Sequence, residues 1–396
     1  MKRVILGVTA SISAYKIANL CSMLVKLNYD VHVIMTKNAT NFINPLIFET
    51  LTNNKCLVDT FDTNEEFPIT HISLPQNADL MLIAPASANI LGKIANGISD
   101  DMLTSCVTAC TCKVLIAPAM NTHMYGNPIT KDNVKKLERF GYAIIEPDTG
   151  MLACGEVGIG KLPAEEVLLD YILREISCDK DLVGEKILIT AGPTRESLDP
   201  VRFITNHSSG KMGYELAKCA MLRGADVTLI SGPTTIKKPP FVDVIDVTSA
   251  RQMYEKVLEY YEDFDIIIKS AAVADYTPKH KSEQKMKKSD GELILELEKT
   301  SDILAYLGKN KKPHQFICGF SMETENMIEN SRKKLEHKNV DMIVANNLTT
   351  KGAGFQGDTN VVTILTKEIV KELELMSKQE VSYKILDEIK EIQNNN

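Results

Sequence analysis

The chain has 396 residues, too many for one ordinary hydrophobic core, so we expect two domains. Apolar residues make up 44% and charged residues 24%, an ordinary globular composition, and the formal net charge of −7 argues against a nucleic-acid-binding protein. No run approaches the roughly 20 apolar residues of a membrane span, and the apolar run Val4–Val8 is too short for a signal peptide. We therefore expect a cytoplasmic protein whose nine cysteines are thiols.

Apolar runs of strand length alternate with helical patterns through the first half of the chain. The expected strands are Val4–Val8, Val31–Met35, Leu80–Ala84, Val114–Ala117 and Tyr142–Ile145. The expected helices are Ala14–Leu27, Ala88–Ala95, Leu103–Cys110, Asn133–Phe140 and residues 164–177. This alternation predicts an α/β domain with a mostly parallel sheet that is covered on both faces.

A polar segment, residues 178–184, separates this pattern from a second one of the same kind. The expected strands are Lys186–Ile189, Asp226–Ile230, Ile266–Lys269, Gln315–Cys318, Met342–Ala345 and Val361–Leu365, with a short one near Phe355. The expected helices are Tyr214–Arg223, Ala250–Tyr260, Asp302–Leu307, Asn326–His337 and Val381–Ile392. The sequence therefore predicts two doubly wound, Rossmann-like α/β domains, at residues 1–180 and 184–396.

Two polar turns of the first domain each follow a strand and open a helix: GVTASISA at 7–14 and APASAN at 84–89. Hydroxyl groups and backbone amides at helix starts bind phosphate, and two such turns at one sheet edge suit a mononucleotide such as a flavin. Neither turn is the GxGxxG motif of dinucleotide-binding proteins. The alternative is that Ser11 only caps the following helix.

Three further side chains of this domain are candidates for chemistry. Asn121, in the turn at 117–124, presents an amide that suits a carboxylate. His71 lies in an alternating segment typical of an edge strand, where a lone histidine usually has no catalytic role. Cys154 lies in a glycine-rich loop, and a thiol on such a loop is a candidate acid or nucleophile.

Three cysteines form the pattern CxxxCxC at residues 106–112. Cys106 and Cys110 share a helix face, and Cys112 falls at the next strand. Because no second pair of metal ligands with the usual spacing follows, we interpret them as buried small side chains rather than as a zinc site.

The segments GVTASISAYK, APASAN, PAMNTHMY and LACGEVGIGKL together resemble the flavin-dependent cysteine decarboxylases, in particular the phosphopantothenoylcysteine decarboxylases. The resemblance implies a flavodoxin-like fold and an FMN near a subunit boundary. It places the FMN on Ser11, Thr36, Ser87 and Asn89. It also implies that His71 lies between flavin and substrate, that Asn121 holds the substrate carboxylate and that Cys154 supplies a proton to the reduced intermediate.

In the second domain, residues 190–213 read TAGPTRESLDPVRFITNHSSGKMG between a strand and a helix. This segment does not match the P-loop motif, because Met212 follows Lys211 and Thr205 stands at the position of the first glycine. What remains is a helix start rich in serine and glycine that suits a phosphate. The turn SAAVADY at 270–276 also follows a strand, and its Asp275 suits a base edge or a metal ion, or is simply solvated.

Lysines around these turns supply the positive charge that a nucleoside triphosphate requires, although lone lysines on a helix usually face solvent. They are Lys285, Lys287, Lys288, Lys334 and Lys338. The lysine-rich piece at 279–288 is expected to be a solvated loop.

The segments AGPTRESLDPVRFITNHSSGKMG, AAVADY, KMKK and GFSMET resemble the CTP-using phosphopantothenate–cysteine ligases. The resemblance implies that Asn206 aids conversion of the substrate carboxyl to an acyl-cytidylate, that Lys285 closes over the triphosphate, and that Mg²⁺ lies on the phosphates near Asp275. It places CTP on Asp275, Lys285, Ser301, Asp302, Ile303, Phe320, Lys334 and Lys338. The chain departs from the pattern at Thr300-Ser301, where Asn-Pro is common, which puts a side-chain contact at Thr300 in doubt.

The two resemblances imply a bifunctional enzyme of coenzyme A biosynthesis that acts on 4′-phosphopantothenate, cysteine and CTP. They also imply a homo-oligomer, built from decarboxylase trimers and ligase dimers into a dodecamer. Two alternatives stay open: a decarboxylase of peptidyl C-terminal cysteine with a degenerate ligase domain, and a flavin-binding regulatory subunit. The presence of both His71 and Cys154 argues against the second.

Overall fold

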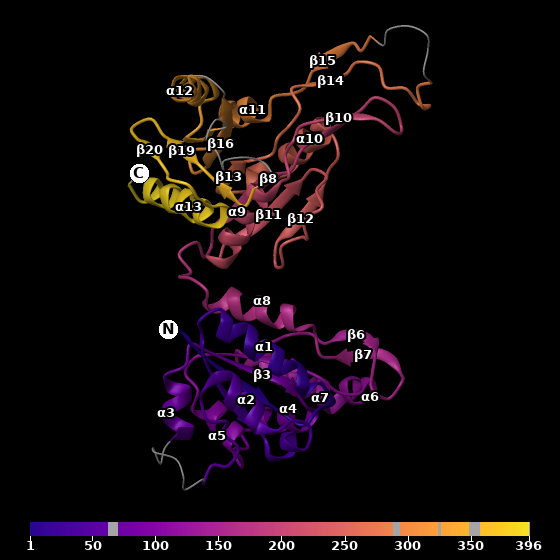
Figure 1. The fold of residues 1–396 in the computed structure, drawn as a ribbon, viewed down its shortest axis with the longest axis vertical. Helices are drawn as coiled ribbons and strands as arrows, with labels where there is room; N and C mark the ends of the chain where they lie inside the picture. Colours follow the sequence, from indigo (N-terminus) through magenta and orange to yellow (C-terminus); the bar gives the residue numbers. More distant parts are fainter. Residues whose placement is uncertain (62–69, 288–293, 324–325, 348–356, 396) are drawn as a thin grey trace. The chain divides into compact units, whose positions relative to one another are not determined.

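The computed structural model describes residues 1–61, 70–287, 294–323, 326–347 and 357–395, so the strand expected near Phe355 lies outside the described residues. The chain divides into two compact units, Met1–Cys178 and Asp179–Asn396. Each unit is a parallel or mostly parallel sheet flanked by helices (Figure 1). The predicted α/β class is therefore confirmed for both.

The N-terminal unit contains a five-stranded parallel sheet in the order β2-β1-β3-β4-β5. Its strands are β1 (Arg3–Val8), β2 (Asp30–Met35), β3 (Leu80–Ala86), β4 (Lys113–Pro118) and β5 (Ala143–Ile144). All five match expected strands, although β5 is shorter than the predicted Tyr142–Ile145. Every residue of β3 is buried, as expected for the central strand of a sheet covered on both faces.

Helices cover both faces of this sheet. They are α1 (Tyr15–Lys26), α2 (Pro45–Thr52), α3 (Thr70–Gln76), α4 (Ala88–Ala95), α5 (Met102–Ala109), α6 (Thr122–Gly126), α7 (Pro128–Arg139) and α8 (Glu165–Ile176). Because side chains alternate along a strand, Val4 and Leu6 of β1 pack in the core with α1, α2 and α8, whereas Ile5 packs in the core with α4, α5 and α7.

One local prediction for this unit was wrong. The segment around His71 forms helix α3 rather than an edge strand, because it packs against α5 and buries Leu74 in the core there. The glycine-rich loop around Cys154 is the connection of an antiparallel hairpin, β6 (Asp148–Met151) and β7 (Val157–Lys161). Gly160 has φ +138, and a Cβ there would lie 2.2 Å from the Met120 carbonyl oxygen, so the hairpin approaches the turn before α6 closely.

The C-terminal unit contains an eight-stranded sheet in the order β12-β11-β8-β13-β16-β17-β19-β20. The strands are β8 (Lys186–Ala191), β11 (Asp226–Ser231), β12 (Asp243–Asp246), β13 (Ile266–Lys269), β16 (Phe316–Glu323), β17 (Met342–Asn347), β19 (Val362–Leu365) and β20 (Val370–Glu372). The first six are parallel, and β19 and β20 add antiparallel pairs at one edge.

Helices α10 (Ala250–Tyr260), α11 (Ile303–Asn310) and α12 (Met327–Lys338) contribute to one core on this sheet. Helix α9 (Lys211–Leu222) packs against β8, and α13 (Lys378–Asn395) packs against α9. A Cβ at Gly213 would lie 2.6 Å from the Ala191 Cβ, so glycine allows the close approach of α9 to β8.

Three two-stranded ladders complete the unit: β9 (Arg195–Ser197) with β10 (Phe203–Thr205), β14 (Tyr276–Pro278) with β15 (Leu297–Lys299), and β18 (Thr359–Asn360) with β21 (Met376–Ser377). Figure 1 shows β14 and β15 extending as an arm beyond the sheet of this unit. The lysine-rich piece belongs to this arm, and its described residues 279–287 are mostly exposed.

Candidate functional sites

A cavity of about 410 Å³ lies where β1, β2 and β3 end in the N-terminal unit. Its lining residues are Thr9, Ala10, Thr36, Lys37, Asn38, Ser87, Ala88, Asn89, Ile90, Lys93, Asp101 and Met124. Three of the four predicted flavin-binding residues, Thr36, Ser87 and Asn89, are among them. Ser11 is not: its hydroxyl lies 2.9 Å from Ser13 Oγ and caps the short helix at 12–14, as in the alternative interpretation.

Thr9 organises the turn between β3 and α4. Its buried hydroxyl donates to the Pro85 carbonyl at 2.6 Å and accepts from the Ser87 backbone N–H at 3.0 Å. Ser87 in turn caps α4, because its hydroxyl accepts from the Ile90 N–H at 3.4 Å. Thr9 lies inside the turn that was predicted to bind a phosphate, but its sequence position alone does not distinguish it from the other hydroxyl residues of that turn.

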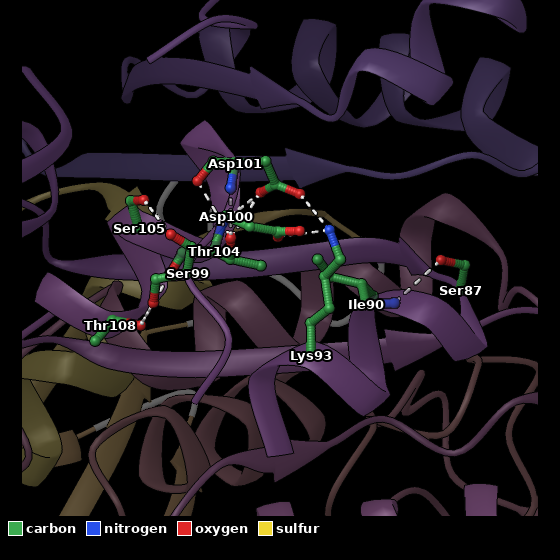
Figure 2. Close-up of polar contacts among 9 residues, drawn as sticks. All are labelled: Ser87, Ile90, Lys93, Ser99, Asp100, Asp101, Thr104, Ser105 and Thr108. Carbon is green, nitrogen blue, oxygen red and sulfur yellow. Dashed lines mark hydrogen bonds and ion pairs between the residues drawn. The ribbon is translucent and has the colours of Figure 1, made fainter. Parts of the chain in front are cut away.

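One wall of the cavity carries a charge network, shown in Figure 2. Lys93 Nζ lies 2.6 Å from Asp100 Oδ1 and 3.1 Å from Asp101 Oδ2. Asp101 also caps α5 in a capping box with Thr104. Burial acts to raise the pKa of Asp101, but hydrogen bonds from Thr104 and the charge of Lys93 outweigh it and lower the pKa, so Asp101 is held ionised beside its lysine.

A second cluster joins the hairpin to the turn before α6. Asn121 Nδ2 lies 3.3 Å from Cys154 Sγ and donates to Glu156 Oε2 at 2.9 Å. Cys154 Sγ lies 3.6 Å from the same carboxylate, and His123 Nε2 lies 3.7 Å from Glu156 Oε1. The Asn121 hydrogen bond, followed by those of Cys154 and the charge of His123, lowers the pKa of Glu156. The two predicted residues therefore meet, together with a carboxylate that the sequence analysis missed.

The cluster and the cavity share helix α6. Asn121 caps this helix by accepting from the His123 N–H at 2.8 Å, and Met124 from the same helix lines the cavity. His71 is not part of either arrangement: it lies on α3 and is not among the residues that line the cavity.

The cysteines of the CxxxCxC pattern lie apart from both arrangements. Cys106 is buried in the core as predicted, whereas Cys110 and Cys112 are only half-buried, and their sulfur atoms lie 3.3 Å apart. Within the described ranges, no group of three or more His, Cys, Asp and Glu side chains is arranged to hold a metal ion.

In the C-terminal unit, the loop before α9 borders a cavity of about 530 Å³. The lining combines residues 206–213, the end of β13 with the turn that follows it, residues 320–322 of β16 and Asn346 of β17 with Lys334, Asn360 and Lys378. Asn206 Nδ2 donates to the carbonyls of Ala272 at 3.1 Å and Val273 at 3.3 Å, which ties the predicted substrate loop to the AAVADY turn. Asp275 and Phe320 line this cavity as well.

A neighbouring cavity of about 270 Å³ lies between the AAVADY turn and the start of α11. The predicted nucleotide residues Ser301, Asp302, Ile303 and Lys334 line it, as does Asp275. The two cavities have four lining residues in common: Lys269, Val273, Asp275 and Lys334. Of these, Lys269 was not named by the sequence analysis as a site residue.

Asp302 and Lys338 form an ion pair at 2.5 Å at the edge of the smaller cavity. Asp302 also caps α11 by accepting from the Ala305 N–H at 2.9 Å. Burial acts to raise the pKa of Asp302, but the Lys338 ammonium and the cap hydrogen bond lower it overall. Lys338 itself lines neither cavity, so its contact with the site runs through Asp302.

Lys285 also lines neither cavity and is exposed on the arm. The arm is attached at two points beside it, where the Ser282 N–H donates to the Leu198 carbonyl at 2.9 Å and the Met286 N–H donates to Asp199 Oδ2 at 3.1 Å.

Thr300, which stands where asparagine is common in the ligases, makes two hydrogen bonds. Its hydroxyl donates to the Ala274 carbonyl at 2.7 Å, and its backbone N–H donates to the Asp275 carbonyl at 3.0 Å. Thr300 therefore fixes the turn that carries Asp275. Two buried threonines also hold this turn, Thr190 near the end of β8 and Thr194 in the loop after it: Thr190 accepts from the Ala271 N–H and Thr194 from the Ala274 N–H.

Comparison with known proteins assigns each unit to a family. Residues 1–177 match the Flavoprotein family, and residues 182–392 match the family of the DNA/pantothenate metabolism flavoprotein C-terminal domain. The chain is 48% identical over 392 residues to the coenzyme A biosynthesis bifunctional protein CoaBC of Bacillus subtilis, covering 98% of this chain and 96% of that protein. The chain belongs to the family of bifunctional coenzyme A biosynthesis proteins.

A second curated relative agrees with this placement. The CoaBC protein of Borreliella burgdorferi is 43% identical over 387 residues, which cover 97% of this chain and 98% of that protein. A crystal structure of the C-terminal domain of a CoaBC protein is 44% identical, has a TM-score of 0.48 and covers 55% of this chain and all of that one. This chain is accordingly a bifunctional enzyme of coenzyme A biosynthesis with a decarboxylase and a ligase activity, and its N-terminal unit is a flavoprotein domain.

None of the helices that the structure describes combines the length and the apolar character of a membrane span.

Proposed function

We propose that the C-terminal unit ligates cysteine to 4′-phosphopantothenate with CTP, and that the N-terminal unit decarboxylates the product to 4′-phosphopantetheine with FMN. The observation that carries the proposal is the meeting of residues predicted separately: Asn121 with Cys154 beside one cavity, and Asp275 with Asp302 around another. A cytoplasmic location is part of the proposal, because these substrates are soluble metabolites.

The donor set of the N-terminal cavity fits FMN. Hydroxyl and amide groups of Thr36, Ser87 and Asn89 line it, and the N-terminus of α4 is directed at the same place, which suits a phosphate. When bound, the flavin supplies the reversible two-electron chemistry that makes loss of CO₂ from the cysteinyl carboxylate possible.

The protein residues then orient the substrate and move protons. The Asn121 amide donates to the substrate carboxylate, and the Cys154 thiol protonates the carbon chain after CO₂ has left. Glu156 holds both side chains in one place, through its contacts with Asn121 Nδ2 at 2.9 Å and Cys154 Sγ at 3.6 Å.

The ligase reaction proceeds in two steps at the C-terminal cavities. A carboxylate oxygen of phosphopantothenate attacks the α-phosphorus of CTP, which forms an acyl-cytidylate, and the bond to the β-phosphate breaks to release pyrophosphate. The cysteine amine then attacks the acyl carbon, loses a proton and displaces CMP. Asn206 lies beside the reacting carboxyl group, and Asp275 and Phe320 contact the cytidine in this proposal.

Mg²⁺ is proposed as the counter-ion of the triphosphate, near Asp275. A single protein carboxylate is sufficient for this, because Mg²⁺ in nucleotide sites retains waters and takes most of its other oxygens from phosphates. Lys334, whose Nζ donates to the Phe320 carbonyl at 3.4 Å, adds positive charge on the same side.

We also propose that copies of the chain assemble, as decarboxylase trimers and ligase dimers that build a dodecamer. His71 and Lys285 support this assembly. Each has a predicted role at one of the sites, but neither lines the cavity of that site within its own chain. In the proposal, His71 of one copy faces the flavin of another and Lys285 of one copy closes over the triphosphate of another. Sedimentation analysis of the full chain tests the assembly, and a monomer would contradict it.

The function is tested by incubating the protein with phosphopantothenate, cysteine and either CTP or ATP, with mass analysis of the products. We expect CMP, pyrophosphate and phosphopantetheine with CTP. Denatured protein is expected to release FMN. Absence of flavin binding would refute the decarboxylase assignment, and absence of cysteine-dependent CMP would leave the alternative of a decarboxylase with an inactive ligase unit.

A further inference from the structure

Lys269 occupies the boundary between the two cavities of the C-terminal unit. It is the last residue of β13, in the middle of the eight-stranded sheet, and it lines both cavities. Its neighbours along the chain form the AAVADY turn, which Thr190, Thr194 and Thr300 hold by hydrogen bonds. The position of the Lys269 backbone is therefore well determined.

The Lys269 ammonium has no hydrogen-bond or ion-pair partner among the described residues. Other lysines that line the larger cavity differ: Lys211 Nζ lies 2.7 Å from Asp358 Oδ1, and Lys378 Nζ donates to the Gly357 carbonyl at 2.5 Å. Partial burial of an ammonium without a partner costs free energy, because the group loses hydrogen bonds to water and gains none from the protein. An anion at the boundary between the cavities would supply the missing partner.

The charged groups around Lys269 come from three elements. Burial, together with the positive charges of Lys334 and Lys338 on α12, lowers the pKa of Lys269 to about 8. Asp302 before α11 and Asp275 after β13 act in the opposite direction without cancelling the shift. Three lysines and two carboxylates therefore face this point. The resulting net positive charge accommodates an additional anion.

The proposed ligation places two anions on either side of this point. Nucleotide residues 301–303 border the smaller cavity, whereas the nucleotide residue Phe320 and the substrate loop 206–213 border the larger one, so the nucleotide extends across the boundary in this proposal. The new bond between the carboxylate oxygen and the α-phosphorus must then form where the cavities meet, and negative charge concentrates on the α-phosphate oxygens as it forms.

We propose that Lys269 is a further catalytic residue of the ligase, and that its ammonium group binds the α-phosphate oxygens while the acyl–phosphorus bond forms and the bond to pyrophosphate breaks. This inference rests on the proposed ligase function. Lys269 acts by charge and donates no proton to a product, so the balance of the step is unchanged. The lysine is protonated when it acts, and raising the pH through about 8 removes its contribution.

The test measures pyrophosphate formation in a single turnover with CTP and phosphopantothenate, before cysteine is added. We expect Lys269→Met to slow this step by about 10²-fold or more, the loss typical of removing one charge-stabilising group, while CTP binding weakens much less. Lys186→Met is the matched control, because Lys186 is an exposed lysine at the opposite end of the neighbouring strand β8. The control is expected to react like the native enzyme.

The pH profile separates a catalytic role from a structural one. For the native enzyme, kcat/KM for CTP is expected to fall above pH about 8. Lys269→Arg, whose guanidinium stays charged, is expected to retain activity and to lose this fall. Because this variant keeps the charge, it also keeps the proposal testable if Lys269→Met fails to fold.

Three results would overturn the inference. If the native enzyme releases pyrophosphate and Lys269→Met does so at the rate of Lys186→Met, the inference alone fails. A kcat/KM that rises through pH 8 and flattens in Lys269→Arg would make Lys269 a base instead. If the native enzyme releases no pyrophosphate from CTP, the proposed ligase function fails and the inference fails with it.

Discussion

Replacing Thr9 by valine removes one hydroxyl from the lining of the proposed flavin cavity and leaves the side-chain shape almost unchanged. Two groups lose their partner: the Pro85 carbonyl, which accepts at 2.6 Å, and the Ser87 N–H, which donates at 3.0 Å. A buried polar group left unsatisfied costs about 1–3 kcal/mol. Pro85 is buried and Ser87 is only half-buried, so water can reach the Ser87 amide, and we expect a total destabilisation of about 2–3 kcal/mol.

The same change should weaken flavin binding, because Thr9 sets the direction of the turn that carries Ser87. We expect the FMN dissociation constant of Thr9→Val to rise about tenfold or more, since each 1.4 kcal/mol corresponds to a factor of ten. Urea unfolding followed by flavin release measures the stability, and quenching of flavin fluorescence measures the affinity. Thr9→Ser, which keeps the hydroxyl and removes a methyl group, is the control and should lose only about 1 kcal/mol. Equal stability and equal flavin affinity of Thr9→Val and Thr9→Ser would refute the role of the Thr9 hydroxyl.

Three other predictions follow from contacts at the sites. Cys154→Ser is expected to slow decarboxylation by at least about 10²-fold, because the proton donor becomes far less acidic, while CMP release by the ligase stays at the native rate; an unchanged yield of phosphopantetheine by mass analysis would contradict the proton-donor role. Asp302→Asn keeps a side chain able to cap α11 but removes the charge partner of Lys338, so KM for CTP should change with little effect on thermal stability, whereas Asp302→Ala should also lose about 1 kcal/mol of stability measured by denaturant unfolding. Equal stability of these two variants would show that the cap is unimportant. Thr300→Val removes the hydrogen bond to Ala274 and should raise KM for CTP several-fold in steady-state kinetics, whereas Thr300→Ser should not.

The strand–turn–helix order was predictable from the sequence because it depends on local patterns. Ser87 and Asp302 were found in this way: each is a small polar residue at the start of an amphipathic helix, where it both caps the helix and faces the sheet edge. The five strands of the N-terminal sheet were also found, since buried parallel strands are nearly continuous apolar runs.

What the sequence could not show depends on contacts between distant segments. The hydroxyl of Thr9 acts on Pro85 and Ser87, some eighty positions away, and Glu156 matters only because a hairpin returns it to Asn121. Lys269 looked like the polar end of a strand, and its place between two cavities requires the whole sheet. The error at His71 has a local cause, since a short alternating segment is compatible with a strand or with two turns of helix.

The short distance between Asn121 and Cys154 has a consequence for inhibitor design. The Cys154 thiol is exposed, and the amide nitrogen that is expected to hold a carboxylate lies 3.3 Å from it. A small electrophile that carries a carboxylate a few bonds from its reactive carbon can therefore be held by the amide while the sulfur attacks. Such a compound would modify this thiol in preference to the buried cysteines of the same unit, Cys21, Cys56 and Cys106, which are inaccessible to reagents in the folded chain.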